Sequence, residues 1–237
     1  MNLFNIKVDK GFTIIELMLA MAFLSALLLA IAMTVIQISN IYNRGLTFTN
    51  VNQAGSMLVS ELQRSISGSP QFDISGSGSD ARYINKTWGG RLCVGQYSYI
   101  WNNGNAIYSK NPNLYIYSDP SKTDTINFVK TIDPNASYCT EPTSKIDSSG
   151  AIELLNKGQN DLAIQSFSIN SEPSAYDSTT GQRLYSISFY IGTNDQTTLE
   201  SGSEACLSGN DVKSDPTYCA VNRFDIVARA GTGNVAK

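Results

Sequence analysis

The sequence predicts an α+β protein in which a long N-terminal membrane-spanning helix packs against a C-terminal antiparallel β-sheet head. Three observations lead to this fold class. An uncharged apolar run fills residues 17–36, an amphipathic helical pattern follows it, and short β-rich segments between turn residues make up the remainder. The chain contains no internal repeat, and its length suits one ordinary domain with an appendage.

Residues 17–36 read LMLAMAFLSALLLAIAMTVI and carry no charge. About 20 apolar residues, rising about 1.5 Å each, span a hydrocarbon core of about 30 Å. The run exceeds the usual apolar core of a secretory signal peptide, and no small-residue cleavage site follows it. Because Lys7 and Lys10 precede the run, we expect a single-pass membrane protein with a cytoplasmic N-terminus and an exported remainder.

One carboxylate, Glu16, stands immediately before this run. A carboxylate carried to the centre of a bilayer costs about 2.5–3.5 kcal/mol, so an intramembrane Glu calls for a partner. Glu16 therefore either marks the membrane interface at the helix start or takes part in a functional charge pair. The residues alone leave both interpretations open.

The helical pattern continues well beyond the apolar run. Gly68, Ser69 and Pro70 then end it, so a helix from Phe12 to Ile66 would be roughly 80 Å long at 1.5 Å per residue. Gly45 and Gly55 weaken its middle by about 1 kcal/mol each relative to Ala and are expected bend points. The apolar stripe that defines the pattern consists of Ile38, Ile41, Phe48, Val51, Ala54, Leu58, Leu62 and Ile66.

Residues 67–237 are expected to form one β-rich head. Within 183–191, alternation predicts that Tyr185, Ile187, Phe189 and Ile191 face the core. The expected strands cover residues 82–85, 91–101, 106–109, 114–118, 126–132, 151–155, 162–170, 183–191 and 223–230.

The chain has four cysteines, which on an exported domain indicate two disulfides. Three pairings are possible. We favour Cys206–Cys219, which would close a short loop, together with Cys93–Cys139. Zinc is the alternative, but no Cys-x-x-Cys spacing supports it.

The composition excludes several function classes. The 237 residues include no His, which removes Ser-His-Asp catalysis, HExxH metalloproteases and imidazole-ligated metal sites. With 17 basic and 20 acidic residues, the chain gives no reason to expect direct nucleic-acid binding. The acidic residues Glu204, Asp211 and Asp215 lack the spacing of an EF-hand and are interpreted as solvated charges. No enzymatic activity, cofactor or metal is expected.

Residues 10–17, Lys-Gly-Phe-Thr-Ile-Ile-Glu-Leu, resemble the class III signal of type IV pilins and type II secretion pseudopilins. The resemblance covers roughly residues 1–66 and implies a lollipop fold. It implies a leader at 1–11, removed by prepilin peptidase between Gly11 and Phe12, and N-methylation of Phe12. In this family the glutamate at the position of Glu16 is thought to pair with the Phe amine of a neighbouring subunit during assembly. The mature parts would be the helix at 12–66, with 12–36 in the membrane and 37–66 amphipathic, and the head at 67–237.

Residues 51–66, with Glu61-Leu62-Gln63-Arg64, resemble the segment before the head in PilW-like and J-type minor subunits. This implies a minor structural subunit of a type IV pilus-like filament, serving adhesion, twitching motility or DNA uptake. The implied partners are other pilin subunits, prepilin peptidase, the membrane and, indirectly, the assembly platform protein and its ATPase. The expected location is the cytoplasmic membrane for the precursor and the extracellular filament, or fimbrium, for the mature form. The alternatives are a minor pseudopilin of a type II secretion system and a membrane-anchored surface adhesin outside a filament.

Overall fold

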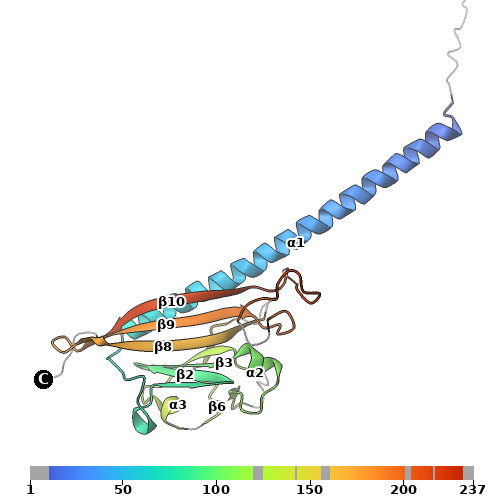
Figure 1. Cartoon of the computed structure of the whole chain (residues 1–237). Coiled ribbons are helices and arrows are strands. Elements are labelled where there is room, and N and C mark those ends of the chain that lie inside the picture. The colour runs from blue at the N-terminus through green and yellow to red at the C-terminus, as the bar shows by residue number, and fades with distance from the viewer. Residues whose placement is uncertain are drawn as a thin grey trace, which may run out of the picture. The chain divides into compact units, whose positions relative to one another are not determined.

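A computed structural model provides the structure of the chain (Figure 1). Lys7 and Lys10, on which the expectation of a cytoplasmic N-terminus depends, lie outside the residues that the structure describes. Contacts divide the chain into two compact units, Met1–Asn43 and Arg44–Lys237, and the long helix α1 (Ile14–Ser67) runs through the boundary. The structure describes residues 11–119, 125–141, 143–155, 161–200, 204–215 and 217–231, without the side chains of 79 and 172–175.

The first unit consists of the N-terminal part of α1. This part is helical from Ile14 because its residues are unbroken by Gly or Pro up to Asn43. In the described part of the chain, α1 is the one helix that is long and apolar enough to cross a membrane. No residue is buried in the 18-residue stretch of α1 that meets this criterion.

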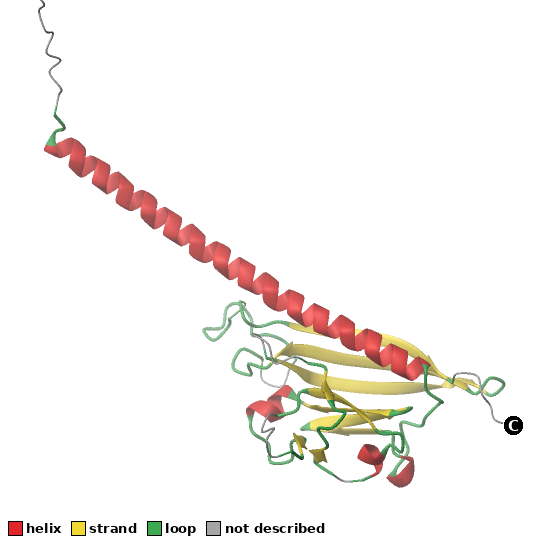
Figure 2. Cartoon of the chain, turned by 180° about the vertical axis from the view of Figure 1, so that it is seen from behind, coloured by secondary structure: helices red, strands yellow, loops and turns green. Residues whose placement is uncertain are grey.

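The second unit contains the C-terminal part of α1 and the head. Figure 2 colours the helices, strands and loops of the chain separately. Its strands form a five-stranded sheet in the order β1-β2-β3-β5-β7, a three-stranded sheet in the order β10-β9-β8, and a parallel pair, β4-β6. The elements are η1 (Gly78–Asp80), β1 (Tyr83–Lys86), β2 (Gly89–Val94), β3 (Tyr97–Asn102), α2 (Gly104–Tyr108), β4 (Ile116–Tyr117), β5 (Phe128–Ile132), α3 (Ser137–Thr140), β6 (Lys145–Ile146), β7 (Ile152–Glu153), β8 (Leu162–Asp177), β9 (Gln182–Thr193) and β10 (Val221–Ala230).

This architecture confirms the α+β layout of a long apolar N-terminal helix and C-terminal antiparallel strands. The expectation of one sheet was wrong, because the head contains two antiparallel sheets. The segment 91–101 forms two strands, β2 and β3, since Gly95 (φ 59°) allows a tight turn between them. The segment 106–109 is not a strand, since it lies mostly in the short helix α2.

One core joins the helix to both antiparallel sheets. Val51, Leu58, Leu62 and Ile66, one stripe of α1, are 0% exposed and belong to the same apolar cluster as side chains from both sheets. The clearest strand prediction is confirmed, because the core-facing side chains of β9 are fully buried: Tyr185, Ile187, Phe189 and Ile191. Burial of this α1 stripe, at roughly 1.5–3 kcal/mol for each large apolar side chain, is what fixes the helix to the head.

Candidate functional site at the start of the apolar helix

The N-terminus of α1 is closed by a hydrogen-bonded capping box. Because the helix begins at Ile14, Thr13 is the N-cap residue and Glu16 occupies the third helical position. Glu16 Oε2 accepts hydrogen bonds from the backbone N–H of Thr13 (3.0 Å) and from its hydroxyl (2.9 Å). In return, the N–H of Glu16 donates to the Thr13 hydroxyl oxygen (3.3 Å). This reciprocal arrangement satisfies donors that a helix start otherwise leaves without partners.

The peptide bond between Gly11 and Phe12 lies just before this cap, in a segment with no helix or strand structure. Phe12 is 87% exposed, and a Cβ added to Gly11 would meet no atom within 4 Å. The bond is therefore sterically open in the isolated chain. A protease needs access to the backbone of the bond that it cuts, and exposed segments without helix or strand structure are preferred sites of cleavage.

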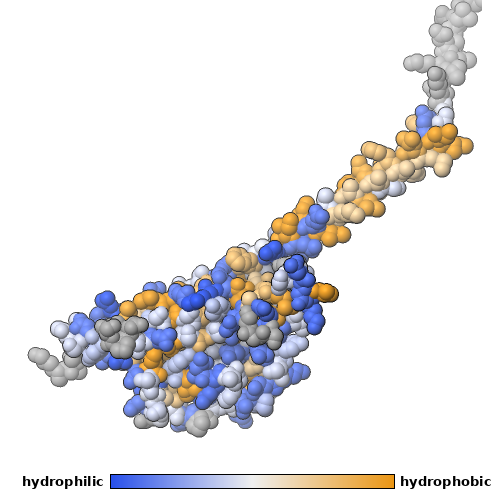
Figure 3. All heavy atoms as spheres, viewed as in Figure 1, coloured by the Kyte–Doolittle hydropathy of each residue, from blue (hydrophilic) through white to orange (hydrophobic). Residues whose placement is uncertain are grey.

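The surface that follows the cap is apolar and uncovered. Figure 3 shows the apolar residues gathered along the N-terminal part of α1. Side chains that a globular protein would bury are exposed here: Ile14, Ile15, Leu17, Met18, Leu19, Phe23, Leu28, Leu29, Ile36 and Ile38. An exposed apolar surface of this extent requires lipid or other protein chains around it.

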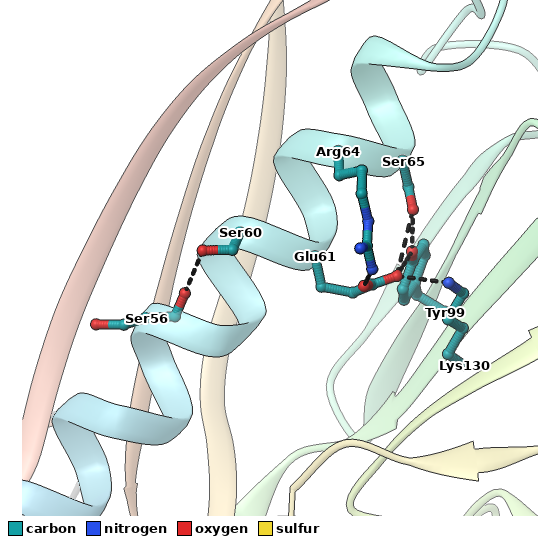
Figure 4. A network of polar contacts seen from close by, with 7 residues as sticks. All are labelled: Ser56, Ser60, Glu61, Arg64, Ser65, Tyr99 and Lys130. Atoms are coloured by element: carbon teal, nitrogen blue, oxygen red, sulfur yellow. Dashed lines mark hydrogen bonds and ion pairs between the residues drawn. The ribbon is translucent and has the colours of Figure 1, made fainter.

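In the second unit, a polar network ties α1 to the five-stranded sheet (Figure 4). Lys130 of β5 contacts Glu61 of α1, with 2.5 Å between Nζ and Oε1, and the two side chains are only 16% and 12% exposed. The hydroxyl of Tyr99 donates to the same carboxylate oxygen at 3.0 Å. Arg64 also pairs with Glu61 but is 78% exposed, so solvent screens most of its contribution.

The charge state of Glu61 follows from these contacts. Burial by itself would raise the pKa of this carboxyl. Hydrogen bonds from Lys130, Tyr99 and Arg64, together with the positive charge of Lys130, outweigh burial and lower the pKa below its usual value. Lys130 Nζ also lies 3.7 Å from the centre of the Tyr97 ring, a cation–π contact. Glu61 is therefore kept ionised, and its contacts link α1 to the five-stranded sheet.

The structure contains both disulfides in the favoured pairing. Cys93–Cys139 joins β2 to α3, and both residues are buried. Cys206–Cys219 closes a loop between β9 and β10.

Two acidic residues of that loop, Asp211 and Asp215, serve local turns. Asp211 accepts a hydrogen bond from the N–H of Lys213 at 2.9 Å, and Asp215 accepts one from the N–H of Thr217 at 3.0 Å. Among the described residues, no three His, Cys, Asp or Glu side chains lie close enough together to hold a metal ion.

Two features of these sites were missed in the sequence. The capping box has a local signal, the Thr-x-x-Glu pattern at Thr13 and Glu16 immediately before an apolar run. Glu61 and Lys130 are far apart in the chain, and no short-range pattern links them.

Comparisons of the chain with protein-family models, with curated proteins and with solved structures give no significant match.

Proposed function

We propose that the chain is a minor structural subunit of a type IV pilus-like filament that serves adhesion, twitching motility or DNA uptake. Prepilin peptidase cuts the precursor between Gly11 and Phe12, and the new amino group on Phe12 is methylated. The mature chain then leaves the membrane by packing its apolar helix against those of other subunits.

The observation that carries the proposal is the order of features at the start of α1. The sterically accessible Gly11–Phe12 bond precedes a capped helix start. The carboxylate of Glu16 lies at the beginning of an apolar helix surface that is not buried. A membrane anchor needs the apolar surface alone. Anchoring does not need the glycine before the bond, and the cap does not need a charge, since Gln also serves in a capping box. Processing uses the glycine, and assembly uses the charge of Glu16.

Cleavage gives Glu16 a charged partner. A cationic amine on Phe12 of a neighbouring subunit, about 4 Å from this carboxylate, would attract it by about 4 kcal/mol at an effective dielectric near 20. That attraction offsets the desolvation of both groups, and it exists only when a second, correctly placed subunit is present. The pair therefore favours assembly in one register over insertion of the subunit at random.

Several contacts attach the C-terminal part of α1 to the head. The buried stripe of α1 and the Glu61–Lys130 contact connect helix and sheet, and two disulfides brace the head itself. A filament subunit is loaded along its helix, so these connections suit the proposed role.

The test is to shear filaments from the native cell and to identify the N-terminal peptide of this chain by mass spectrometry. We expect a peptide that begins with N-methylated Phe12 in the sheared fraction. A Gly11→Val variant should instead accumulate as an uncut precursor in the membrane. Gly209→Val is the matched control, because Gly209 also has open space around it but lies in a head loop. An intact precursor confined to the membrane fraction of the wild-type cell would overturn the proposal.

A further inference from the structure

A cavity of about 500 Å³ opens on the head. Its lining comes from β1, β2, the segment before β4, α3 and the residues that follow α3. Cavities of about 300–1,000 Å³ are typical of sites for small ligands. The proposed filament role makes no use of this cavity, which belongs entirely to the second unit.

One wall of the cavity holds a buried cation without an anionic partner. Arg91 of β2 is 4% exposed, and its guanidinium lies over the ring of Tyr115 at 4.5 Å from the ring centre. It donates hydrogen bonds to the carbonyl oxygens of Tyr138 and Glu141. Its Nε is buried without a hydrogen-bond partner, and Arg91 has no ion pair with any residue that the structure describes. A buried charge is costly unless an opposite charge compensates it, so this wall favours an anion.

A second cation stands at the same cavity. Lys86 of β1 is exposed and also forms no ion pair within the described ranges. Opposite charge is sparse by comparison, since the lining contains one carboxylate, Glu141, which is exposed. The net charge of the lining is therefore positive.

The wall that carries Arg91 is held in place covalently. Cys139 of α3 lines the cavity and is bonded to Cys93, which lies two residues beyond Arg91 on β2. The two carbonyl groups that Arg91 binds flank Cys139 in or directly after α3. The guanidinium is thus fixed before any ligand arrives, which reduces the entropy lost on binding.

The remaining lining indicates the class of ligand. Trp88 is half-buried and offers an aromatic surface, while Asn113 and Ser144 are exposed and their side chains form no hydrogen bonds with described residues. Glu141 can only accept hydrogen bonds when ionised, so it suits the hydroxyl-bearing part of a ligand. Its charge opposes a phosphate, which carries close to two negative charges at neutral pH, more than a carboxylate, which carries one. A ligand with an anionic end, a flat apolar face and several hydroxyl groups satisfies all of these side chains.

We propose that the cavity binds a sugar that carries a carboxylate. The carboxylate lies toward Arg91 and Lys86, the sugar ring lies against Trp88, and hydroxyl groups bind Glu141 and the neighbouring polar side chains. This proposal rests on the geometry of the head alone and does not depend on cleavage or filament assembly.

The experiment uses the full chain in lipid nanodiscs, titrated with a disaccharide that ends in glucuronic acid and with its counterpart that ends in glucose. The two probes differ only in the carboxylate, and binding is followed by calorimetry and by saturation-transfer NMR. We expect saturable binding of the acidic sugar and about tenfold weaker binding of the neutral one, as removal of a charge-assisted contact implies.

Variants assign the binding to this cavity. Trp88→Ala should weaken binding of the acidic sugar about tenfold, and Lys86→Gln should weaken it about threefold. Glu141→Gln should not strengthen binding of the neutral sugar. Lys213→Gln is the control for Lys86→Gln, because Lys213 is also exposed but does not line the cavity. Arg91 is left intact because its removal would disturb α3.

Four results would overturn the proposal. The first is no saturable binding of the acidic sugar, and the second is equal binding of the two sugars. The third is an unchanged affinity in Trp88→Ala. Tighter binding of an acetylated peptide with a free C-terminal carboxylate than of the acidic sugar would likewise reject a sugar as the ligand.

Discussion

Glu16 accepts two hydrogen bonds from Thr13 within the same helix start, at 3.0 Å from the backbone nitrogen and 2.9 Å from the hydroxyl. This contact gives Glu16 a structural role that needs no second subunit. The proposed pairing with a neighbouring amine uses the negative charge of the same carboxylate. The two roles can be separated, because a capping box needs a hydrogen-bond acceptor at this position while the ion pair needs a charge.

Glu16→Gln keeps the acceptor and removes the charge, since Gln also serves in a capping box. We expect the variant to be cut and inserted normally but to be missing from sheared filaments. Thr13→Ala breaks the box and keeps the charge. It should lower helix stability by about 1 kcal/mol while leaving the chain in filaments.

The measurement is the ratio of this chain in sheared and membrane fractions, with circular dichroism of the detergent-solubilised protein as the readout for the helix. Equal incorporation of Glu16→Gln and wild type would show that the charge has no part in assembly. Loss of Thr13→Ala from filaments would show instead that the cap itself is needed.

Local patterns predicted the long helix and several head strands because their periodicity extends over many residues. The same patterns failed at 106–109, where Ile107 and Tyr108 favour a strand but the turn at Asn103 starts the short helix α2. Four residues are too few for propensity to outweigh such a context. The division of strands between two sheets depends on contacts distant in sequence and has no local signal.

The residues of the candidate site likewise differ in whether a local sequence pattern can identify them. The Gly11–Phe12 bond and Glu16 belong to one short segment, so a sequence pattern can find them. The partner of Glu61 on β5 is brought to it only by the packing of α1 on the five-stranded sheet. The same is true of the cavity around Arg91, whose lining comes from several separate segments.

The Glu61–Lys130 contact is expected to contribute to the stability of the head. Removing one member of a well-buried pair costs about 3–5 kcal/mol, and the slight exposure of both side chains places the expected loss near 2 kcal/mol. Glu61→Gln and Lys130→Met should each show this loss in urea unfolding, and the double variant should lose less than the sum. Arg64→Gln is the control and should change stability by less than about 1 kcal/mol.

The same pair predicts a dependence on pH. The pKa of Glu61 is lowered in the folded chain, so its contribution is fully present above the unfolded-state value near 4.5 and is lost as pH falls through the lower folded-state value. Unfolding curves measured between neutral pH and about pH 3 should therefore converge for wild type and Glu61→Gln at the acid end. A difference that stays constant over that range would exclude ionisation of Glu61 as its cause.

The two disulfides should differ in their effect on stability. They close loops with sequence separations of 46 and 13 residues, for which the chain-entropy estimates are about 4 and about 3 kcal/mol. Replacing Cys93 and Cys139 together by Ser should therefore destabilise the head more than replacing Cys206 and Cys219 together. Buried hydroxyls at the first pair add to the difference, since Cys93 and Cys139 are 2% and 3% exposed. Denaturant midpoints of the two double variants test the order, which equal midpoints would refute.

Gly45 and Gly55 of α1 lie in different surroundings, although the sequence presents both as bend points. An added Cβ at Gly45 would meet nothing within 4 Å, whereas at Gly55 it would overlap the ring of Phe224 on β10. Gly55 thus allows the helix and the three-stranded sheet to approach closely. Gly55→Ala should destabilise the head by about 1–3 kcal/mol through overpacking, despite the better helix propensity of Ala.

Gly45→Ala is the matched control, because the same change there only improves helix propensity and should stabilise α1 by up to about 1 kcal/mol. Reducing the ring in a Gly55→Ala/Phe224→Leu double variant should recover part of the loss. Urea unfolding of the four proteins measures these effects. If Gly55→Ala were as stable as Gly45→Ala, the close approach of α1 to β10 would not require a glycine, and the residue would act only as a weak point in the helix.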